Sequence, residues 1–515
     1  MSTTPPERSD SSSDSGTLDR NVLLVASVVV LGAIMTILDV TVVNVAINAL
    51  AQEFETTLTT IQWVATGYTL ALATVIPLTA WGAERFGTKR LYMISIALFV
   101  IGSALAGTAW DATSLIVFRV LQGLGGGMLM PIGMTILTRA AGPHRVGRVM
   151  SVIGIPMLLG PVFGPILGGW LVDGFSWRLI FLINLPIGVA ALVLAARLLP
   201  RDGVGARLPL DYRGVAMLSP GLALLIYGLA ESGTHGGFGH VQVLLPAIAG
   251  ALLLALFVRH ALRTPAPLVD LRLFTNRVFS ASIITMVLMT LAVFGGMLLL
   301  PLYLQLVRGE SALETGLLLA PQGLGAMLAM PIAGRLADRT GVGRIVPVGL
   351  AIILTTFWWL TGLEADTPYL NLGIALFFMG LGMGFTMMPT MTGALQTLRR
   401  ASIAAASTTL NITQQVGASV GTALMTVILT GALTSRLGGG TGASGGIGAL
   451  AQLPAEQFAR IQPLLAAAFG ATFWWAVGFV SIAFVVALVL LPKRKPAPVE
   501  EDGGAPAATP PVVIH

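Results

Sequence analysis

The sequence contains no cysteine and few charged residues, and both absences limit what the protein can be. Without cysteine there are no disulfides, no thiol chemistry and no cysteine-ligated metal sites. Charged residues make up 10% of the chain, against about 25% in a typical soluble domain. The five histidines are scattered, and neither a phosphate-binding GxxxxGK[ST] loop nor an HExxH motif occurs. We therefore expect neither an enzyme nor an ATP-driven pump, and no cofactor.

In place of charge the sequence has long apolar runs. It is 55% hydrophobic, and runs of about 20 apolar residues, long enough to cross a bilayer as a helix, recur along it. The expected fold class is an all-α membrane protein with 14 transmembrane helices. The expected spans are 21–47, 58–80, 91–109, 113–137, 149–172, 179–199, 213–231, 240–262, 278–306, 313–334, 345–363, 368–394, 404–432 and 464–492.

The distribution of charge predicts how these spans are oriented. Most of the 29 lysines and arginines fall in the two tails and in the loops after even-numbered spans, whereas acidic residues favour the opposite loops. Because basic loops stay on the cytoplasmic side, both termini are expected to be cytoplasmic. Residues 1–20, rich in Ser, Asp and Pro, and residues 493–515 are predicted to be tails, the first disordered. The basic pI thus reflects membrane topology, and no nucleic-acid partner is expected.

An internal repeat divides the chain. "PLTAWGAERFGTKR" (77–90) and "PIAGRLADRTGVGR" (331–344) share five identities at a constant offset of 254, and "GLGGG" (123–127) matches "GLGMG" (380–384) at 257. Parallel six-helix repeats are typical of transporters whose halves rock against each other. The expected domains are a six-helix bundle at 21–200, two inserted helices at 201–276 and a second six-helix bundle at 277–492.

Two ionisable residues lie deep in the predicted spans, Asp39 in the first and Arg119 in the fourth. Each costs about 2.5–3.5 kcal/mol at a helix centre by insertion scales, so each needs a partner or a water-filled cavity. A static ion pair that fixes two helices is one interpretation. The other is a carboxyl group whose partner changes with conformation and which therefore takes up and releases a proton near neutral pH.

Other residues within spans are candidates for packing, bending or ligand binding. Gly160, Gly164 and Gly168 share one face of the fifth span and predict a close helix contact. Pro161 and Pro165 interrupt its backbone hydrogen bonds and favour bending. A methionine stripe in the twelfth span suits either a pocket for varied apolar ligands or ordinary packing. The candidates for a substrate cavity are Asn44, Tyr68, Gln122, Met130, Met383, Met387, Asn411, Gln414 and Gln415.

Four segments resemble the major facilitator superfamily, in particular its 14-helix drug:proton antiporters of the EmrB/QacA type. They are "LDVTVVNVA" (38–46), "RVLQGLGGG" (119–127), "GPVFGPILGG" (160–169) and "SWRLIFLINLPIG" (176–188). The cytoplasmic loop motif G-x-L-A-D-R-x-G-R-K is imperfect in the first copy, where Ala80, Gly82, Glu84 and Thr88 replace its Gly, Leu, Asp and Arg, and closer in the second copy.

The resemblance implies a proton-coupled exporter of hydrophobic, amphipathic or cationic drugs in a bacterial inner membrane, working by alternating access. Protons would pass through Asp39, tuned by Arg119, and protonation of Asp39 would compete with substrate. Glu84, Arg85, Asp338 and Arg339 would form charge latches at the cytoplasmic face. Membrane lipids are expected partners. Three alternatives remain: an exporter or flippase of an endogenous lipid or natural product, a membrane receptor or scaffold that does not transport, and a nutrient symporter.

Overall fold

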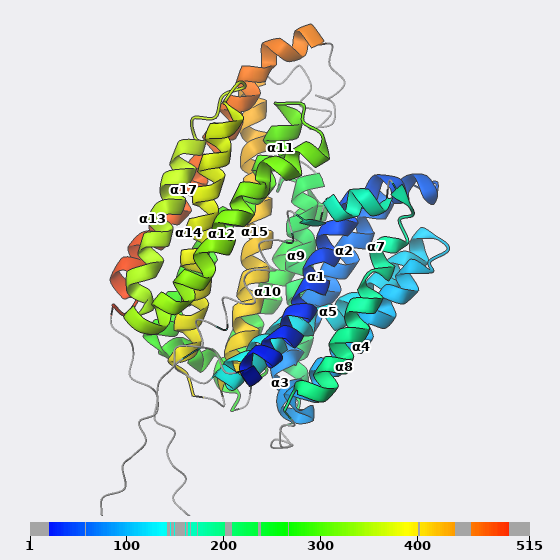
Figure 1. The fold of residues 1–515 in the computed structure, drawn as a ribbon, viewed down its shortest axis with the longest axis vertical. Helices are drawn as coiled ribbons and strands as arrows, with labels where there is room; N and C mark the ends of the chain where they lie inside the picture. Colours follow the sequence, from blue (N-terminus) through cyan, green and yellow to red (C-terminus); the bar gives the residue numbers. More distant parts are fainter. Residues whose placement is uncertain are drawn as a thin grey trace, which may run out of the picture.

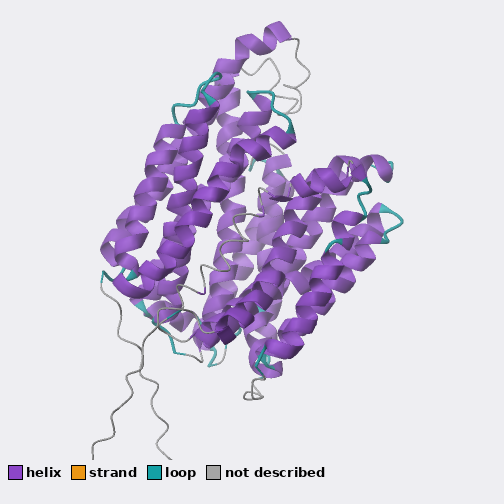
Figure 2. Cartoon of the chain, in the orientation of Figure 1, coloured by secondary structure: helices purple, strands orange, loops and turns teal. Residues whose placement is uncertain are grey.

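The computed structural model describes most of the chain as helices joined by short loops (Figure 2). The described residues are 20–56, 58–141, 145, 149, 160, 163–164, 166–172, 174–200, 209–234, 238–265, 267–399, 402–437 and 455–493. No strand occurs among them, so the predicted all-helical class is confirmed for this part of the chain.

The helices form two bundles and a pair between them in sequence (Figure 1). The N-terminal bundle comprises α1 (Arg20–Glu53), α2 (Leu58–Val75), α3 (Leu78–Phe86), α4 (Thr88–Gly107), α5 (Ala112–Ala141), α7 (Leu179–Leu182) and α8 (Asn184–Leu198). The inserted pair is α9 (Tyr212–Thr234) and α10 (Val241–Arg263), followed by the short 3-10 helix η1 (Leu271–Thr275). The C-terminal bundle comprises α11 (Arg277–Leu306), α12 (Ala312–Thr340), α13 (Val342–Leu360), α14 (Tyr369–Gln396), α15 (Ile403–Leu437) and α17 (Ala455–Leu490).

Twelve of the helical segments described are long and apolar enough to cross a membrane, and a bent pair adds a thirteenth. The expected fifth span, 149–172, is described at only some of its residues. The total of 14 therefore stays a prediction. The second span expected at 58–80 corresponds to α2 and the start of α3, between which the chain bends by 57°. Pro77 stands at the bend and cannot donate the backbone hydrogen bond that would continue the helix.

Both ends of the described chain lie at the same end of the molecule. Figure 1 shows the start of α1 and the end of α17 at the bottom, together with α3. This agrees with the predicted even number of transmembrane spans, which also places both termini on one side of the membrane. We use "inner" below for this end and "outer" for the opposite one.

The two bundles are built on the same glycine contacts, which supports the internal repeat. In the "GLGGG" segment of α5, the first and last glycines lie against α2 and Gly125 lies against α4. In the "GLGMG" segment of α14, the first and last glycines lie against α12 and Gly382 lies against α13. Residues without a Cβ let helices approach closely, so the pattern positions corresponding helices in each bundle.

The repeated loop motif also adopts one backbone conformation twice. Gly87, between α3 and α4, has φ 84° and ψ 148°, and Gly341, between α12 and α13, has φ 90° and ψ 145°. Only glycine reaches this region without strain. The conformation lets the chain turn at once from one helix into the next at the inner face.

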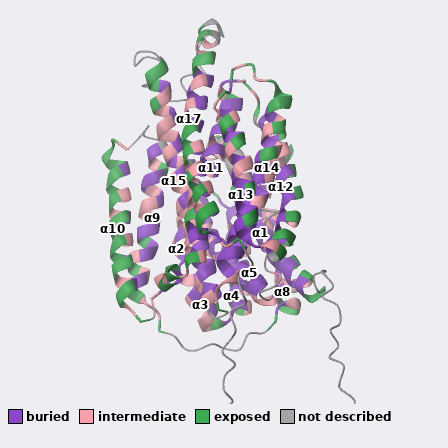
Figure 3. Cartoon of the chain, turned by 90° about the vertical axis from the view of Figure 1, so that its left-hand side faces the viewer, coloured by how far each residue is buried: buried purple, intermediate pink, exposed green. Residues whose placement is uncertain are grey.

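The inserted pair lies at the side of the two bundles. α9 contacts both α2 and α15, whereas α10 packs on α9. Figure 3 shows α10 at the edge of the molecule with most of its surface exposed. Its exposed side chains include Leu245, Leu252 and Leu262. In a chain of this composition such a face meets lipid rather than water.

Candidate functional site

A buried ion pair joins α1 to α5 inside the N-terminal bundle. Asp39 lies near the middle of α1, and its Oδ2 is 2.6 Å from Nη1 of Arg119. Each residue is 1% exposed. Each of the two buried charges is expected to need a partner, and Asp39 and Arg119 are partners of each other. A buried pair of this kind costs much desolvation, which only good geometry and further hydrogen bonds offset.

Two amides supply those further hydrogen bonds. Gln122 donates from Nε2 to Asp39 Oδ1 over 2.8 Å and accepts from Arg119 Nη1 over 2.8 Å. Asn184, at the start of α8, donates from Nδ2 to Asp39 Oδ1 over 3.3 Å and to Ser103 Oγ on α4 over 3.1 Å. Side chains of α5 and α8 therefore bond one carboxylate on α1, and Asn184 connects it to α4. A change in the charge of Asp39 would therefore change the hydrogen bonds that connect α1 with α5 and α8.

The arginine contacts α2 as well. Its Nε donates to the carbonyl oxygen of Val64 over 3.2 Å, and its guanidinium carbon lies 4.2 Å from the centre of the Tyr68 ring. A cation over an aromatic face is attracted by the negative charge of the ring face. The Tyr68 hydroxyl is buried and has no hydrogen-bond partner among the described residues.

The glycine face predicted in the fifth span lies against α1 beside Asp39. A Cβ at Gly160 would collide with Ile37, and one at Gly164 would collide with Thr41. At Gly168 it would lie 3.2 Å from the carbonyl oxygen of Val42. The predicted close contact is thus present, and its partner is the helix that carries the carboxylate.

A cavity of about 290 Å³ lies between the two bundles. α1, α2 and α5 line one side of it, and α11, α14 and α15 line the other. Seven of the nine candidate cavity residues line it: Tyr68, Met130, Met383, Met387, Asn411, Gln414 and Gln415. Gln122 is instead buried against the ion pair. The side chain of Asn44 lies outside the described residues.

The ion pair lies behind the cavity wall. Neither Asp39 nor Arg119 is among the described residues that line the cavity, whereas Tyr68 both lines it and covers the Arg119 guanidinium. Tyr68 is therefore the side chain that connects the cavity to the buried charges. A molecule in the cavity can contact Tyr68 without touching either charge.

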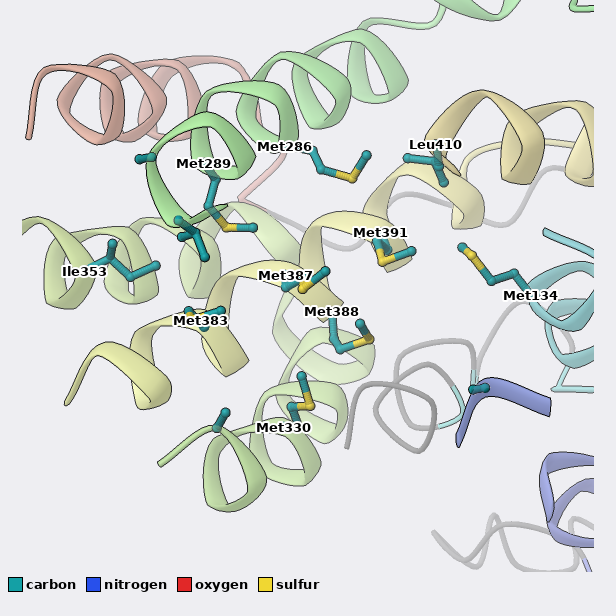
Figure 4. Close-up of a cluster of buried hydrophobic side chains, with 14 of the residues drawn as sticks. Met134, Met286, Met289, Met330, Ile353, Met383, Met387, Met388, Met391 and Leu410 are labelled. Atoms are coloured by element: carbon teal, nitrogen blue, oxygen red, sulfur yellow. The ribbon is translucent and has the colours of Figure 1, made fainter. Parts of the chain in front are cut away.

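The C-terminal side of the cavity is rich in sulfur. Figure 4 shows methionines from α11, α12 and α14 gathered in one cluster, with Met134 of α5 facing it. Met383 and Met387 line the cavity, while Met379 and Met391 are buried in the packing of the bundle. The predicted stripe thus contributes to both the pocket and the core. Flexible thioether side chains can adapt to apolar ligands of different shape.

The two bundles touch at the inner end of the cavity. Asn411 of α15 lies 3.3 Å from the sulfur of Met134 on α5. Leu78 and Trp81 of α3 belong to one apolar cluster with Ile412 and Val416 of α15. Toward the outer end the bundles diverge (Figure 1). The described parts of the two bundles therefore meet on the inner side of the cavity.

The predicted latch residues lie at the inner face. Glu84 is half-buried near the end of α3, beside Arg85, and within electrostatic reach of Arg139 on α5. Arg339 is exposed near the end of α12. The side chain of Asp338 and the residues Pro161 and Pro165 lie outside the described part. The latch and bending roles of these residues stay predictions.

Sequence reasoning missed three polar residues. Asn184 and Ser103 complete the network around Asp39, and the available signal was an amide and a hydroxyl in apolar runs. His260 lies 2.9 Å from Asp211 and joins α10 to the start of α9. No cluster that could hold a metal ion is found among the described residues.

Comparison with known proteins places the chain in a family. Residues 29–422 match the Major Facilitator Superfamily. The chain is 50% identical over 405 residues to the Multidrug resistance protein B homolog of Mycobacterium tuberculosis, which covers 78% of this chain and 75% of that protein. It is 31% identical over 392 residues to the Multidrug export protein EmrB of Haemophilus influenzae, covering 76% and 77%.

A solved structure shares the fold at low sequence identity. The human organic anion transporter MFSD10 superposes with a TM-score of 0.61 at 15% identity, covering 91% of this chain and all of that one. Together with the paired bundles and the cavity between them, these matches identify the chain as a membrane transporter that belongs to the major facilitator superfamily.

Proposed function

We propose that this protein exports hydrophobic, amphipathic or cationic drugs from the cytoplasm or inner leaflet in exchange for protons. The observation that carries the proposal is Tyr68, which lines the central cavity and covers the guanidinium of a buried Asp39–Arg119 pair. The names of the M. tuberculosis and H. influenzae relatives support drugs as the substrates.

The proposed membrane is a bacterial inner membrane, with both termini in the cytoplasm. Basic residues gather at the inner end, as Lys89, Arg139 and Arg344 illustrate. Basic segments are retained on the cytoplasmic side. The inner end is then cytoplasmic, and the divergent outer end of the cavity faces the outside.

Proton binding at Asp39 would drive a rearrangement of the N-terminal bundle. A protonated Asp39 no longer balances Arg119, and an uncompensated buried charge costs several kcal/mol. The guanidinium must then find another acceptor or water, and α1 must shift against its neighbours. The glycines that face Ile37 and Thr41 allow α1 to slide closely past the fifth span.

Competition between substrate and proton would act through Tyr68. Asp39 lies behind the described cavity wall, so a substrate need not touch the carboxylate. A ligand that displaces the Tyr68 ring would weaken its contact with Arg119 and change how strongly Arg119 holds Asp39. In this proposal, substrate and proton compete through the intervening side chain of Tyr68, without direct contact between the substrate and the carboxylate.

The driving force is sufficient for useful export. A pH difference of one unit is worth about 1.4 kcal/mol per proton, and ~100 mV adds about 2.3 kcal/mol per charge. One proton per cycle therefore supports a concentration gradient of about several hundred-fold for an uncharged substrate.

The test uses inside-out vesicles with an acid interior and a fluorescent probe of the pH difference. Ethidium added outside should dissipate the pH difference in the wild type and fail to do so in Asp39→Asn. A Met391→Leu variant, altered in the core of the other bundle, serves as the control and should behave as wild type.

The possible results distinguish between the proposed function and its alternatives. Unchanged dissipation in Asp39→Asn would move proton coupling to another residue. No response of the wild type to any lipophilic cation would favour a lipid or natural product as the substrate. Ligand binding in detergent without counterflow in liposomes would favour a receptor.

A further inference from the structure

A second cavity lies beside the central one, in the outer half of the molecule. Its volume is about 340 Å³, and its walls come from α2, α9, α11 and α15. Ala418 of α15 lines both cavities, so they are neighbours along that helix. We propose that this outer cavity is a second substrate subsite that selects protonated amines, an inference that rests on the proposed export function.

Hydroxyl groups dominate the polar lining of the outer cavity. Thr69 on α2 and Ser419, Thr422 and Thr426 on α15 are among its lining residues. Each donates its proton to the carbonyl oxygen four residues earlier in its own helix, over 2.9–3.0 Å. With their protons so engaged, these oxygens have only lone pairs left for a ligand. These four oxygens give the cavity a surface that consists mainly of hydrogen-bond acceptors, beside the hydroxyl of Thr66.

A site of acceptors discriminates between ligands by their donors. None of the described lining residues carries a charge, so the polar side-chain groups that a ligand meets there are hydroxyls. A protonated primary, secondary or tertiary amine brings a positive charge and at least one N–H donor. Hydrogen bonds in which one partner is charged are stronger than neutral ones. A quaternary ammonium has the charge but no donor and would gain less.

The inserted helices provide one wall of this subsite. Ile226, Leu229 and Ala230 of α9 close the cavity at the side. α9 is held to α2 at two levels, by a stacked Trp63–Tyr227 pair at 5.7 Å and by Ser219 Oγ, which donates to the Thr74 carbonyl oxygen over 2.7 Å. Because α9 packs on both α2 and α15, rocking of the bundles would change its position against at least one of them. The wall would then shift as the transporter cycles, and the subsite would change shape.

The experiment compares a tertiary amine, protonated at the assay pH, with its N-methylated quaternary analogue. In the double variant T422V/T426V, valine keeps the shape of threonine and removes the acceptor. Binding of the tertiary amine should weaken about tenfold, while the quaternary analogue should change by about twofold or less. Transport competition in vesicles should show the same loss of preference.

Matched variants separate recognition from general damage. Thr430 donates to its own helix in the same way, over 2.9 Å, but is not among the lining residues, so T430V should behave as wild type. The variant T422S keeps a hydroxyl at this position and should keep the preference for the tertiary amine. If the double variant fails to fold, L229W fills the cavity from α9 and should weaken tertiary-amine binding by a similar factor.

The outcomes distinguish the two proposals. Equal losses for both amines, or no loss for either in a folded double variant, would overturn the acceptor subsite while leaving export intact. Failure of wild-type vesicles to export either amine would instead contradict the proposed function itself.

Discussion

The two bundles share a scaffold and differ in what they hold inside it. Applying the repeat offsets, the positions of Asp39, Arg119 and Gln122 correspond to Val293, Leu376 and Met379 in the second copy. Glycine contacts are kept in both copies, whereas the charged network occurs in the first and a methionine cluster occurs in the second. The chain thus assigns the charges to one bundle and the adaptable apolar surface to the other.

A second difference concerns one proline. Pro77 and Pro331 occupy equivalent positions in the repeated loop motif. The first stands at the 57° bend between α2 and α3, and the second lies inside the continuous α12. Only the bent copy carries its inner segment, with Leu78 and Trp81, into the cluster with α15. The same residue therefore has different consequences, because the neighbouring helices differ.

The largest effect is expected from removing the charges that distinguish the first bundle. Asp39→Asn leaves Arg119 buried without a counter-charge and should destabilise the protein by about 3–5 kcal/mol, with loss of proton-coupled export. The double variant D39N/R119Q removes both charges and should recover most of that stability without recovering coupling. Thermal unfolding in detergent and proton flux in vesicles measure the two properties separately.

A control in the second bundle sharpens this test. Met379 is the counterpart of Gln122, and Met379→Leu conserves its volume, so both stability and coupling should stay near wild type. Full proton-coupled export by D39N/R119Q would show that the network is structural and that the bundles do not divide their roles in this way.

The sequence predicted the scaffold better than the site. Apolar runs report which segments leave water, and the spacing of glycines reports close helix contacts, so spans, repeat and glycine face could be read directly. The pairing of Asp39 with Arg119 depends on how α1 and α5 pack. From the sequence it could be anticipated only because the two residues lie at similar depths in their predicted spans. The parts played by Asn184 and Ser103 depend on which way two buried side chains face, which no periodicity reveals.

The bend between α2 and α3 shows a further limit. Pro77 and Pro331 give the same local signal, yet one interrupts a helix and the other does not. The contacts that the bent segment α3 makes with α15 join residues more than 300 positions apart in the sequence. Such long-range packing is not encoded in the motif itself.

A smaller, matched effect is expected from the shared glycines. A Cβ at Gly125 would lie 2.5 Å from the Phe99 nitrogen, and one at Gly382 would lie 2.6 Å from Ile353. Gly125→Ala and Gly382→Ala should therefore each destabilise the protein by about 1–3 kcal/mol through overpacking. Gly478 has no atom within 4 Å of such a Cβ, so Gly478→Ala should be neutral or slightly stabilising. A loss confined to one bundle would mean that the repeated pattern is not equally required.

The smallest effect concerns the inserted pair, which belongs to neither copy of the repeat. The Asp211 carboxylate accepts hydrogen bonds from the backbone amides of Gly214 and Leu268 and pairs with His260, which ties α9 to α10. Burial raises the pKa of Asp211, but these hydrogen bonds and His260 outweigh it and hold the pKa below its ordinary value of 3.8.

A carboxyl group whose pKa is lower in the folded state stabilises the protein above its unfolded pKa, and that stabilisation is lost as the pH falls through the folded value. Asp211→Asn should therefore lower the unfolding temperature slightly at neutral pH, and the difference from wild type should shrink below about pH 4.

Asp111→Asn is a useful comparison, because Asp111 also has a lowered pKa, from its hydrogen bonds with Ser114, but lies in the loop between α4 and α5. One outcome is that Asp211→Asn is the one of these two variants that changes the preference for tertiary over quaternary amines. In that case the Asp211–His260 contact sets the position of α9 and with it the wall of the outer cavity. If neither variant alters that preference, the contacts of α9 with α2 are sufficient to hold the wall in place.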